Sequence, residues 1–152
     1  LWVRPFAALG AGLLADRIGD ARCVAICFSI VLIGDVVFAL GVLPPSAGSL
    51  LIMNVVWISA GVFGLRGVYF ALFEDGQVPV TLTGTAVGVV SVIGYTPDIF
   101  MGPLMGYLTD NYPGSLGHKY LFAVLAGFAA IGLATTLAFQ RLTPAVSDHE
   151  AD

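Results

Sequence analysis

The chain has 152 residues, of which 58% are hydrophobic and 11% are charged, and its mean hydropathy is +0.94. Soluble domains are typically about 45–50% apolar and about 25% charged. So few charged side chains do not cover a water-soluble globule of this length, and a lipid bilayer is the expected solvent and partner. The net charge of −4 provides no basic surface, so nucleic acid is excluded as an expected partner.

Five apolar segments follow one another, joined by short connections rich in Gly, Pro, Asp or Asn. The first, residues 1–14, starts inside an apolar run without a charged leader, and we expect it to be the end of a helix whose beginning is missing. The other four are long enough at 1.5 Å per residue to cross a hydrocarbon core of about 30 Å. They are residues 23–43, 49–73, 85–108 and 119–139.

These segments are expected to be helices. Backbone that spans a membrane must satisfy its own hydrogen bonds, and the runs lack the two-residue alternation of a barrel strand. The fold class is therefore all-α integral membrane, with one transmembrane region over residues 1–142 and a short disordered tail over residues 143–152.

The basic residues predict the orientation. With five crossings, Arg17, Arg22 and Arg141 fall on one side of the membrane, and Lys119 falls on the other. The positive-inside rule then places the loop at residues 15–22 and the C-terminus in the cytoplasm.

Two similar passages close the first and the fourth segments. They are residues 12–16 (GLLAD) and residues 106–110 (GYLTD), and three helices separate them. An odd number of crossings puts the two passages on opposite sides of the membrane. This arrangement is typical of the inverted three-helix repeats of secondary transporters.

The first passage continues into a longer motif. Residues 12–19 (GLLADRIG) resemble the G-x-x-x-D-R-x-G signature of the major facilitator superfamily, which lies in a cytoplasmic loop of each six-helix half in that family. The family usually continues with a basic pair. Asp20 and Ala21 stand there in this chain, so the copy is degraded, as is usual in the C-terminal half of family members.

Each residue of this conformational-switch loop has a physical role. Gly12 allows two backbones to approach closely, and Gly19 permits a tight turn. Asp16 is expected near the N-terminus of the next helix, where the helix dipole favours negative charge. Arg17 can pair with carboxylates or with lipid phosphates.

The resemblance covers nearly the whole chain. Residues 66–71 (RGVYFA), 79–88 and 94–103 (GYTPDIFMGP) are similar to the last three helices of bacterial members. The resemblance implies the end of helix eight through helix twelve of a twelve-helix transporter. It also implies that the missing N-terminal half of the same transporter is a partner of this chain, in the inner or plasma membrane.

Four charged residues fall inside the apolar segments: Arg4, Asp35, Arg66 and Asp98. A charge at the centre of a membrane helix costs roughly 2.5–3.5 kcal/mol on insertion scales, so each one needs a reason. Two are positive and two are negative, so they could pair with one another. Asp35 is expected to have a structural partner, and the sequence does not decide the role of Arg4.

Asp98 belongs to a stripe at alternating spacings of four and three residues, which places its members on one helix face. The stripe consists of Gly84, Gly88, Ser91, Tyr95, Asp98 and Gly102. It predicts either a face that lines a solute path, with Asp98 as proton carrier or ion ligand, or a small-residue seam for close helix packing. Tyr95 and Asp98 favour the solute path. Gly106 extends the packing face, and Pro97 and Pro103 predict a bend or hinge.

Arg66 is the main candidate for binding a solute. Its planar fork suits a carboxylate or phosphate on a substrate, or a protein carboxylate such as Asp98. The alternative is a structural salt bridge, or a side chain that extends to the membrane interface. Asn54 and Trp57 could also face a cavity.

Catalytic and metal-binding patterns are not found in the sequence. Cys23 and Cys27 have no histidine near them, and His118 and His149 each stand alone. No Ser/His/Asp arrangement occurs. We therefore expect neither an enzyme nor a bound metal or cofactor.

The function predicted from the sequence is secondary active transport of a small organic solute by a proton- or ion-coupled symporter, of which this chain is a fragment. The alternative is a membrane scaffold or the anchor subunit of a complex. The intramembrane charges allow an anionic or a zwitterionic solute, and they do not specify its identity or the direction of transport.

Overall fold

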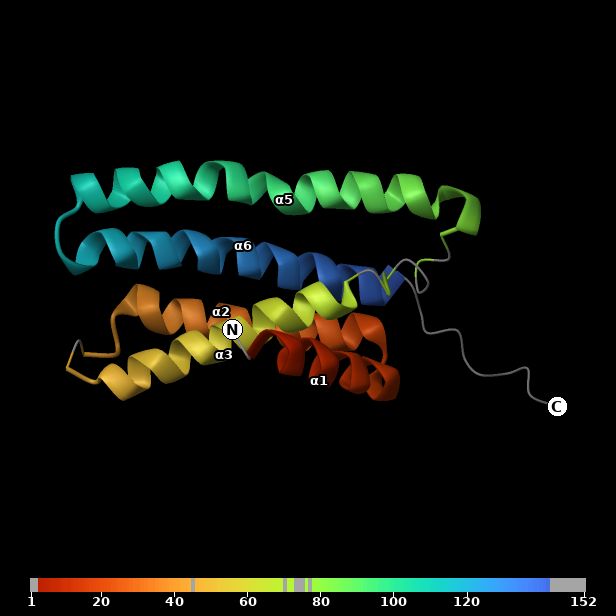
Figure 1. Ribbon diagram of the computed structural model, residues 1–152, viewed down its shortest axis with the longest axis horizontal. Helices are drawn as coiled ribbons and strands as arrows, with labels where there is room; N and C mark the ends of the chain where they lie inside the picture. The colour runs from red at the N-terminus through yellow and green to blue at the C-terminus, as the bar shows by residue number, and fades with distance from the viewer. Residues whose placement is uncertain (1–2, 45, 70, 73–75, 77, 143–152) are drawn as a thin grey trace.

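The computed structural model describes residues 3–44, 46–69, 71–72, 76 and 78–142, apart from the side chains of Val3, Val80 and Asp98. The regular elements of this part of the chain are helices (Figure 1). They are α1 (Val3–Ile18), α2 (Asp20–Leu40), α3 (Gly48–Val68), α5 (Val80–Asn111) and α6 (Ser115–Leu142). Four of them, α2, α3, α5 and α6, are long and apolar enough to cross a membrane. The chain is therefore all-α with the features of an integral membrane protein.

Helices α1, α2 and α3 form one packed group, α6 lies against α2, and α5 lies against α6 (Figure 1). Helices α2 and α6 run antiparallel. The ring of Phe38 lies 4.6 Å from that of Phe122 near one end, and Gln140 Nε2 donates a hydrogen bond of 2.7 Å to the carbonyl of Ala21 near the other.

Small residues bring α3 close to its neighbours. A Cβ atom at Gly61 would lie 2.7 Å from Val31 Cγ2, and one at Gly64 would lie 2.9 Å from Cys27 Sγ. A Cβ at Gly67 would lie 3.2 Å from the carbonyl oxygen of Ala8 on α1. The glycines that recur every three residues in this helix therefore allow close packing against both α1 and α2.

The buried core lies inside the α1–α2–α3 group and contains both cysteines. Its members are Ala11, Ala15, Cys23, Val24, Cys27 and Val68. The Cys23 thiol donates a hydrogen bond of 3.3 Å to the carbonyl of Ala11, which further connects α2 to α1. Both thiols are free, and here they pack as small hydrophobic side chains.

A single residue, Gly19, separates α1 from α2. Its φ of 91° lies in the region that L side chains rarely adopt. Its N–H donates to the carbonyl of Ala15 at 2.8 Å, and its own carbonyl accepts from the N–H of Cys23 at 3.1 Å. The turn is therefore fully hydrogen-bonded and depends on glycine.

The helices extend beyond most of the predicted boundaries. Helix α1 runs to Ile18 where the apolar run ends at residue 14, and α5 covers Val80–Asn111 where the sequence predicts 85–108. Apolar content marks the part of a helix in hydrocarbon, whereas backbone hydrogen bonding continues into the polar interface. Helix α3 is shorter, because Tyr69 forms its C-cap where the sequence predicts helix to residue 73. The predicted tail at 143–152 lies outside the described residues.

Large apolar side chains cover the outer faces of the helices. Ile52 on α3 is 67% exposed, and Val92 and Ile99 on α5 are 71% and 78% exposed. Such extensive apolar surface would drive aggregation in water and is well solvated by lipid tails.

Candidate functional site

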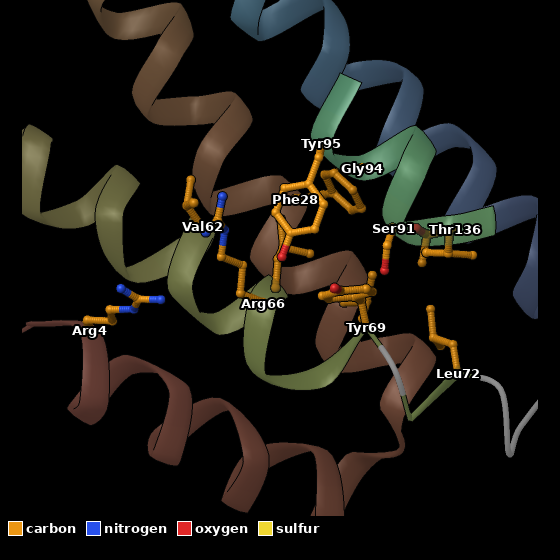
Figure 2. Close-up of a pocket in the computed structure, with 13 residues that line it drawn as sticks. Arg4, Phe28, Val62, Arg66, Tyr69, Leu72, Ser91, Gly94, Tyr95 and Thr136 are labelled. Atoms are coloured by element: carbon orange, nitrogen blue, oxygen red, sulfur yellow. The ribbon is translucent and has the colours of Figure 1, made fainter. Parts of the chain in front are cut away.

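A cavity of about 560 Å³ lies between the α1–α2–α3 group and the α5–α6 pair (Figure 2). Every helix contributes to its lining: Arg4 from α1, Phe28 from α2, Arg66 from α3, Tyr95 from α5 and Thr136 from α6. Its volume falls in the range of pockets that bind small organic molecules.

Arg66 lies in the last turn of α3 and lines this cavity. The carboxyl end of a helix carries a partial negative charge that favours a cation there. The side chain is exposed and makes no hydrogen bond or ion pair with the residues that the structure describes.

Ser91 and Tyr95 enter the cavity from α5. They are one turn apart, so they lie on the same face of that helix. Figure 2 shows the ring of Tyr95 extending from α5 toward α3. Both hydroxyl-bearing residues of the predicted α5 stripe thus line the same cavity as Arg66.

Tyr69, which the sequence analysis did not select, also lines the cavity. It follows α3, and its N–H donates to the carbonyl of Leu65 at 2.9 Å. The pKa of its phenol is raised, first by burial and then by charge on Tyr95, while Arg66 lowers it. These electrostatic effects connect Tyr69 with residues of both α3 and α5.

Arg4 is the second cation of the cavity. Its Cζ atom lies 5.6 Å from the centroid of the Phe63 ring, which is within the range of a cation–π interaction. Its partner ring is on α3, three residues before Arg66. The pairing of α1 with α3, which the sequence does not reveal, gives Arg4 its place in the site.

Asn54 lies apart from this cavity. Its Nδ2 donates a hydrogen bond of 3.0 Å to the carbonyl of Gly34 on α2. Nearby, Trp57 Nε1 donates to the carbonyl of Ile30 at 3.1 Å. Both residues line a separate hollow of about 280 Å³. The described hydrogen bond of Asn54 connects α3 to α2, and a solute contact for this residue stays a prediction.

Asp98 lies on α5, three residues beyond Tyr95, and its side chain is outside the part that the structure describes. The predicted Arg66–Asp98 pair therefore falls outside the described contacts. Asp35 is 2% exposed, and its Oδ1 accepts no hydrogen bond from the described residues. The structural partner predicted for Asp35 is not found among them.

The glycines predicted for packing on α5 have open surroundings. These glycines are Gly84, Gly88, Gly102 and Gly106. A Cβ atom at any of these positions would meet no atom of the described residues within 4 Å. The same holds for Gly12 of the loop motif, where close approach was expected. Pro97 and Pro103 lie inside α5. Asp16 and Arg17 are exposed at the end of α1.

The comparisons with known proteins identify two relatives from Escherichia coli strain K12. The inner membrane protein YqcE is 35% identical over 88 residues, which cover 56% of this chain and 20% of the relative. The inner membrane protein YihN is 29% identical over 123 residues, which cover 80% of this chain and 29% of the relative. This chain is similar to inner membrane proteins. It spans less than a third of the length of either relative.

These comparisons correct the family assignment made from the sequence. No protein-family model matches the chain, and no solved structure matches it. The two relatives are named only as inner membrane proteins, so the assignment to the major facilitator superfamily is withdrawn. The motif at residues 12–19 is too short to carry it, because glycine and aspartate are common where helices end and turn.

The relatives and the four apolar helices together support a multi-pass protein of the inner membrane. A cavity lined by two arginines is unusual in such a setting. Ionisable groups inside a membrane are costly, and they usually mark a solute or ion pathway.

Proposed function

We propose that the protein carries a small organic solute across the inner membrane by secondary active, proton- or ion-coupled transport. One observation carries this proposal: Arg66 lines a cavity of about 560 Å³ among apolar helices and forms no hydrogen bond or ion pair with the described residues. A purely structural arginine in this setting would be expected to form an ion pair or hydrogen bonds, since an unpaired charge in low dielectric is unfavourable.

Alternating access would come from the movement of two groups of helices about the cavity. The similar passages at residues 12–16 and 106–110 lie near the ends of α1 and α5, and each is followed by a short connection and the next helix, α2 or α6. This correspondence supports an inverted-repeat architecture. We propose that other helices of the complete gene product, an N-terminal half among them, close the cavity.

The proposed orientation keeps the C-terminus in the cytoplasm. The hydrogen bond between Gln140 and Ala21 supports this, because it joins the end of α6 that carries Arg141 to the end of α2 that carries Arg22. Lys119 belongs to the other end, where its side chain reaches Gly41. A fusion of alkaline phosphatase or green fluorescent protein after residue 142 tests the assignment: only the fluorescent fusion should be active.

Uptake measurements test the transport proposal. Right-side-out membrane vesicles that contain the complete gene product are given a panel of labelled organic acids, amino acids and sugars. At least one compound should accumulate, and a protonophore or sodium ionophore should abolish the gradient-dependent part. Arg66→Ala should lower that accumulation about tenfold or more at unchanged membrane content, because it removes a charge-assisted contact with the solute.

Arg141→Ala, which removes an exposed cation in the last turn of α6, is the matched control and should leave uptake unchanged. Normal uptake by Arg66→Ala would remove this residue from the pathway. Absence of any uptake, together with recovery of the protein in a stoichiometric complex, would favour the scaffold or anchor function instead.

A further inference from the structure

The two arginines of the cavity lie on adjacent helices at a similar level. Arg4 contacts the ring of Phe63 at 5.6 Å, and Phe63 and Arg66 are three residues apart on α3. Residues at this spacing are neighbours on a helix surface. Figure 2 shows Arg4 and Arg66 toward one end of the cavity and Leu72 and Thr136 toward the other.

The charges of this pair are not balanced within the described lining. The described side chains that line the cavity include no carboxylate. Neither guanidinium forms an ion pair with a residue that the structure describes. Both guanidinium groups line the same cavity, and an anion bound between them would balance their positive charges.

The opposite wall offers hydroxyl groups. Ser91 and Tyr95 project from α5, and neither makes a side-chain hydrogen bond with the described residues. Thr136 is different, since its hydroxyl already donates to the carbonyl of Gly132 at 2.8 Å. The cavity thus has a cationic end, two hydroxyl groups on α5 and apolar surface from Phe28 and Leu72.

We infer that the site binds a hydroxylated organic anion, with its carboxylate or phosphate group between Arg4 and Arg66 and its hydroxyl-bearing body against Ser91 and Tyr95. This inference rests on the proposed transport function for its biological setting, and it assigns the class of solute. The guanidinium fork binds both oxyanions through paired N–H groups, which favours it over a lysine at such a site.

The minimal probe is inorganic phosphate. Thermal unfolding of the purified complete gene product in detergent is compared in phosphate and in chloride at equal ionic strength. Phosphate should raise the unfolding temperature of the wild type by several degrees, because a ligand that binds only the folded state stabilises it. Arg66→Gln and Arg4→Gln should each abolish this difference, while Arg66→Lys should keep part of it. Arg141→Gln, outside the cavity, should keep all of it.

A matched series then defines the solute. Gluconate, sorbitol 6-phosphate and sorbitol share a hydroxylated six-carbon body and differ in the charged group. At least one of the two anions should bind about tenfold more tightly than sorbitol, and this preference should disappear in Arg66→Gln.

Several results would overturn the inference. These are equal unfolding temperatures of the wild type in phosphate and chloride, a phosphate effect that survives both glutamine variants, and tighter binding of sorbitol than of both anions. A phosphate effect that emerges only in Asp98→Asn would show that Asp98 neutralises the pair. Stabilisation by phosphatidylglycerol nanodiscs over phosphatidylcholine nanodiscs, without any effect of free phosphate, would identify a lipid headgroup and reject the solute.

The two proposals fail separately. Anion binding that depends on both arginines, without uptake in vesicles, would leave the anion site standing and reject transport. Uptake of a neutral solute that is insensitive to both glutamine variants would leave transport standing and reject the anion site.

Discussion

Helices α3 and α5 are both long and apolar enough to cross the membrane, yet they are held in different ways. Helix α3 buries Gly61, Gly64 and Val68 against α1 and α2. Helix α5 has only Leu108 buried among its described side chains, although it is the longest helix. The cavity lies along the border between these two environments.

The difference shows that similar sequence patterns serve different roles. Both helices carry regularly spaced glycines, which alone predict close packing. On α3 the glycines meet neighbouring helices, whereas on α5 the positions of Gly84 and Gly88 are open. The glycine-bearing face of α3 has helices packed against it, whereas that of α5 has none among the described residues. Regular glycine spacing therefore produces close packing only where another helix lies against that face.

The largest expected effect comes from filling a glycine contact. Gly64→Leu places a large side chain where even a Cβ would lie 2.9 Å from Cys27 Sγ and 3.3 Å from Ala11 Cβ. Because the core cannot expand without breaking contacts, we expect a loss of about 3 kcal/mol in the free energy of unfolding. Steric trapping or thermal unfolding of the complete gene product measures it.

Gly88→Leu is the matched control on α5. A Cβ there meets no described atom within 4 Å, so this change should alter stability by less than about 1 kcal/mol. Equal losses for the two variants would show that the open face of α5 is covered in the complete protein, and the contrast between α3 and α5 would not hold.

A smaller effect is expected at the turn between α1 and α2. Gly19→Ala places a Cβ on a residue whose φ is 91°, a conformation that is strained for alanine. This change should lower the free energy of unfolding by about 1–2 kcal/mol. Gly12→Ala lies on α1, where a Cβ meets no described atom within 4 Å, and it should be neutral or stabilising by up to about 1 kcal/mol. Thermal unfolding of both variants compares them, and a destabilising Gly12→Ala would indicate a helix packed on that face in the complete protein.

The sequence predicted the class of fold because side chains that face lipid must be apolar, a requirement local to each segment. The ends of the helices were less predictable. Helix α5 extends to Asn111 and α6 begins at Ser115, because backbone hydrogen bonds extend past the apolar region. The family assignment failed because it depended on short motifs, which the comparisons did not support.

The candidate site was predictable only in part. Ser91 and Tyr95 share a helix face by spacing alone, and the cost of a charge within a membrane helix drew attention to Arg66. Arg4 and Tyr69 join them through contacts between helices far apart in sequence. Periodicity within one helix does not indicate which other helix faces it. The places of Arg4 and Tyr69 in the site could therefore be identified only from the tertiary structure.

The smallest expected effect tests the polar contacts between α3 and α2. Asn54→Leu removes the Nδ2 hydrogen bond to the carbonyl of Gly34, and Trp57→Phe removes the Nε1 hydrogen bond to the carbonyl of Ile30. Interhelical hydrogen bonds in membranes average about 0.6 kcal/mol, so each variant should lower the free energy of unfolding by roughly that amount.

Uptake measurements with Asn54→Leu provide a second test of the role of Asn54. The sequence alone allowed Asn54 to face a solute, whereas its bond to α2 predicts that Asn54→Leu changes stability and leaves the affinity for solute unchanged. A change of about tenfold in the KM of uptake, at unchanged protein content, would instead place Asn54 on the solute path. The contrast between α3 and α5 would then need revision, because a residue now assigned to packing would belong to the cavity.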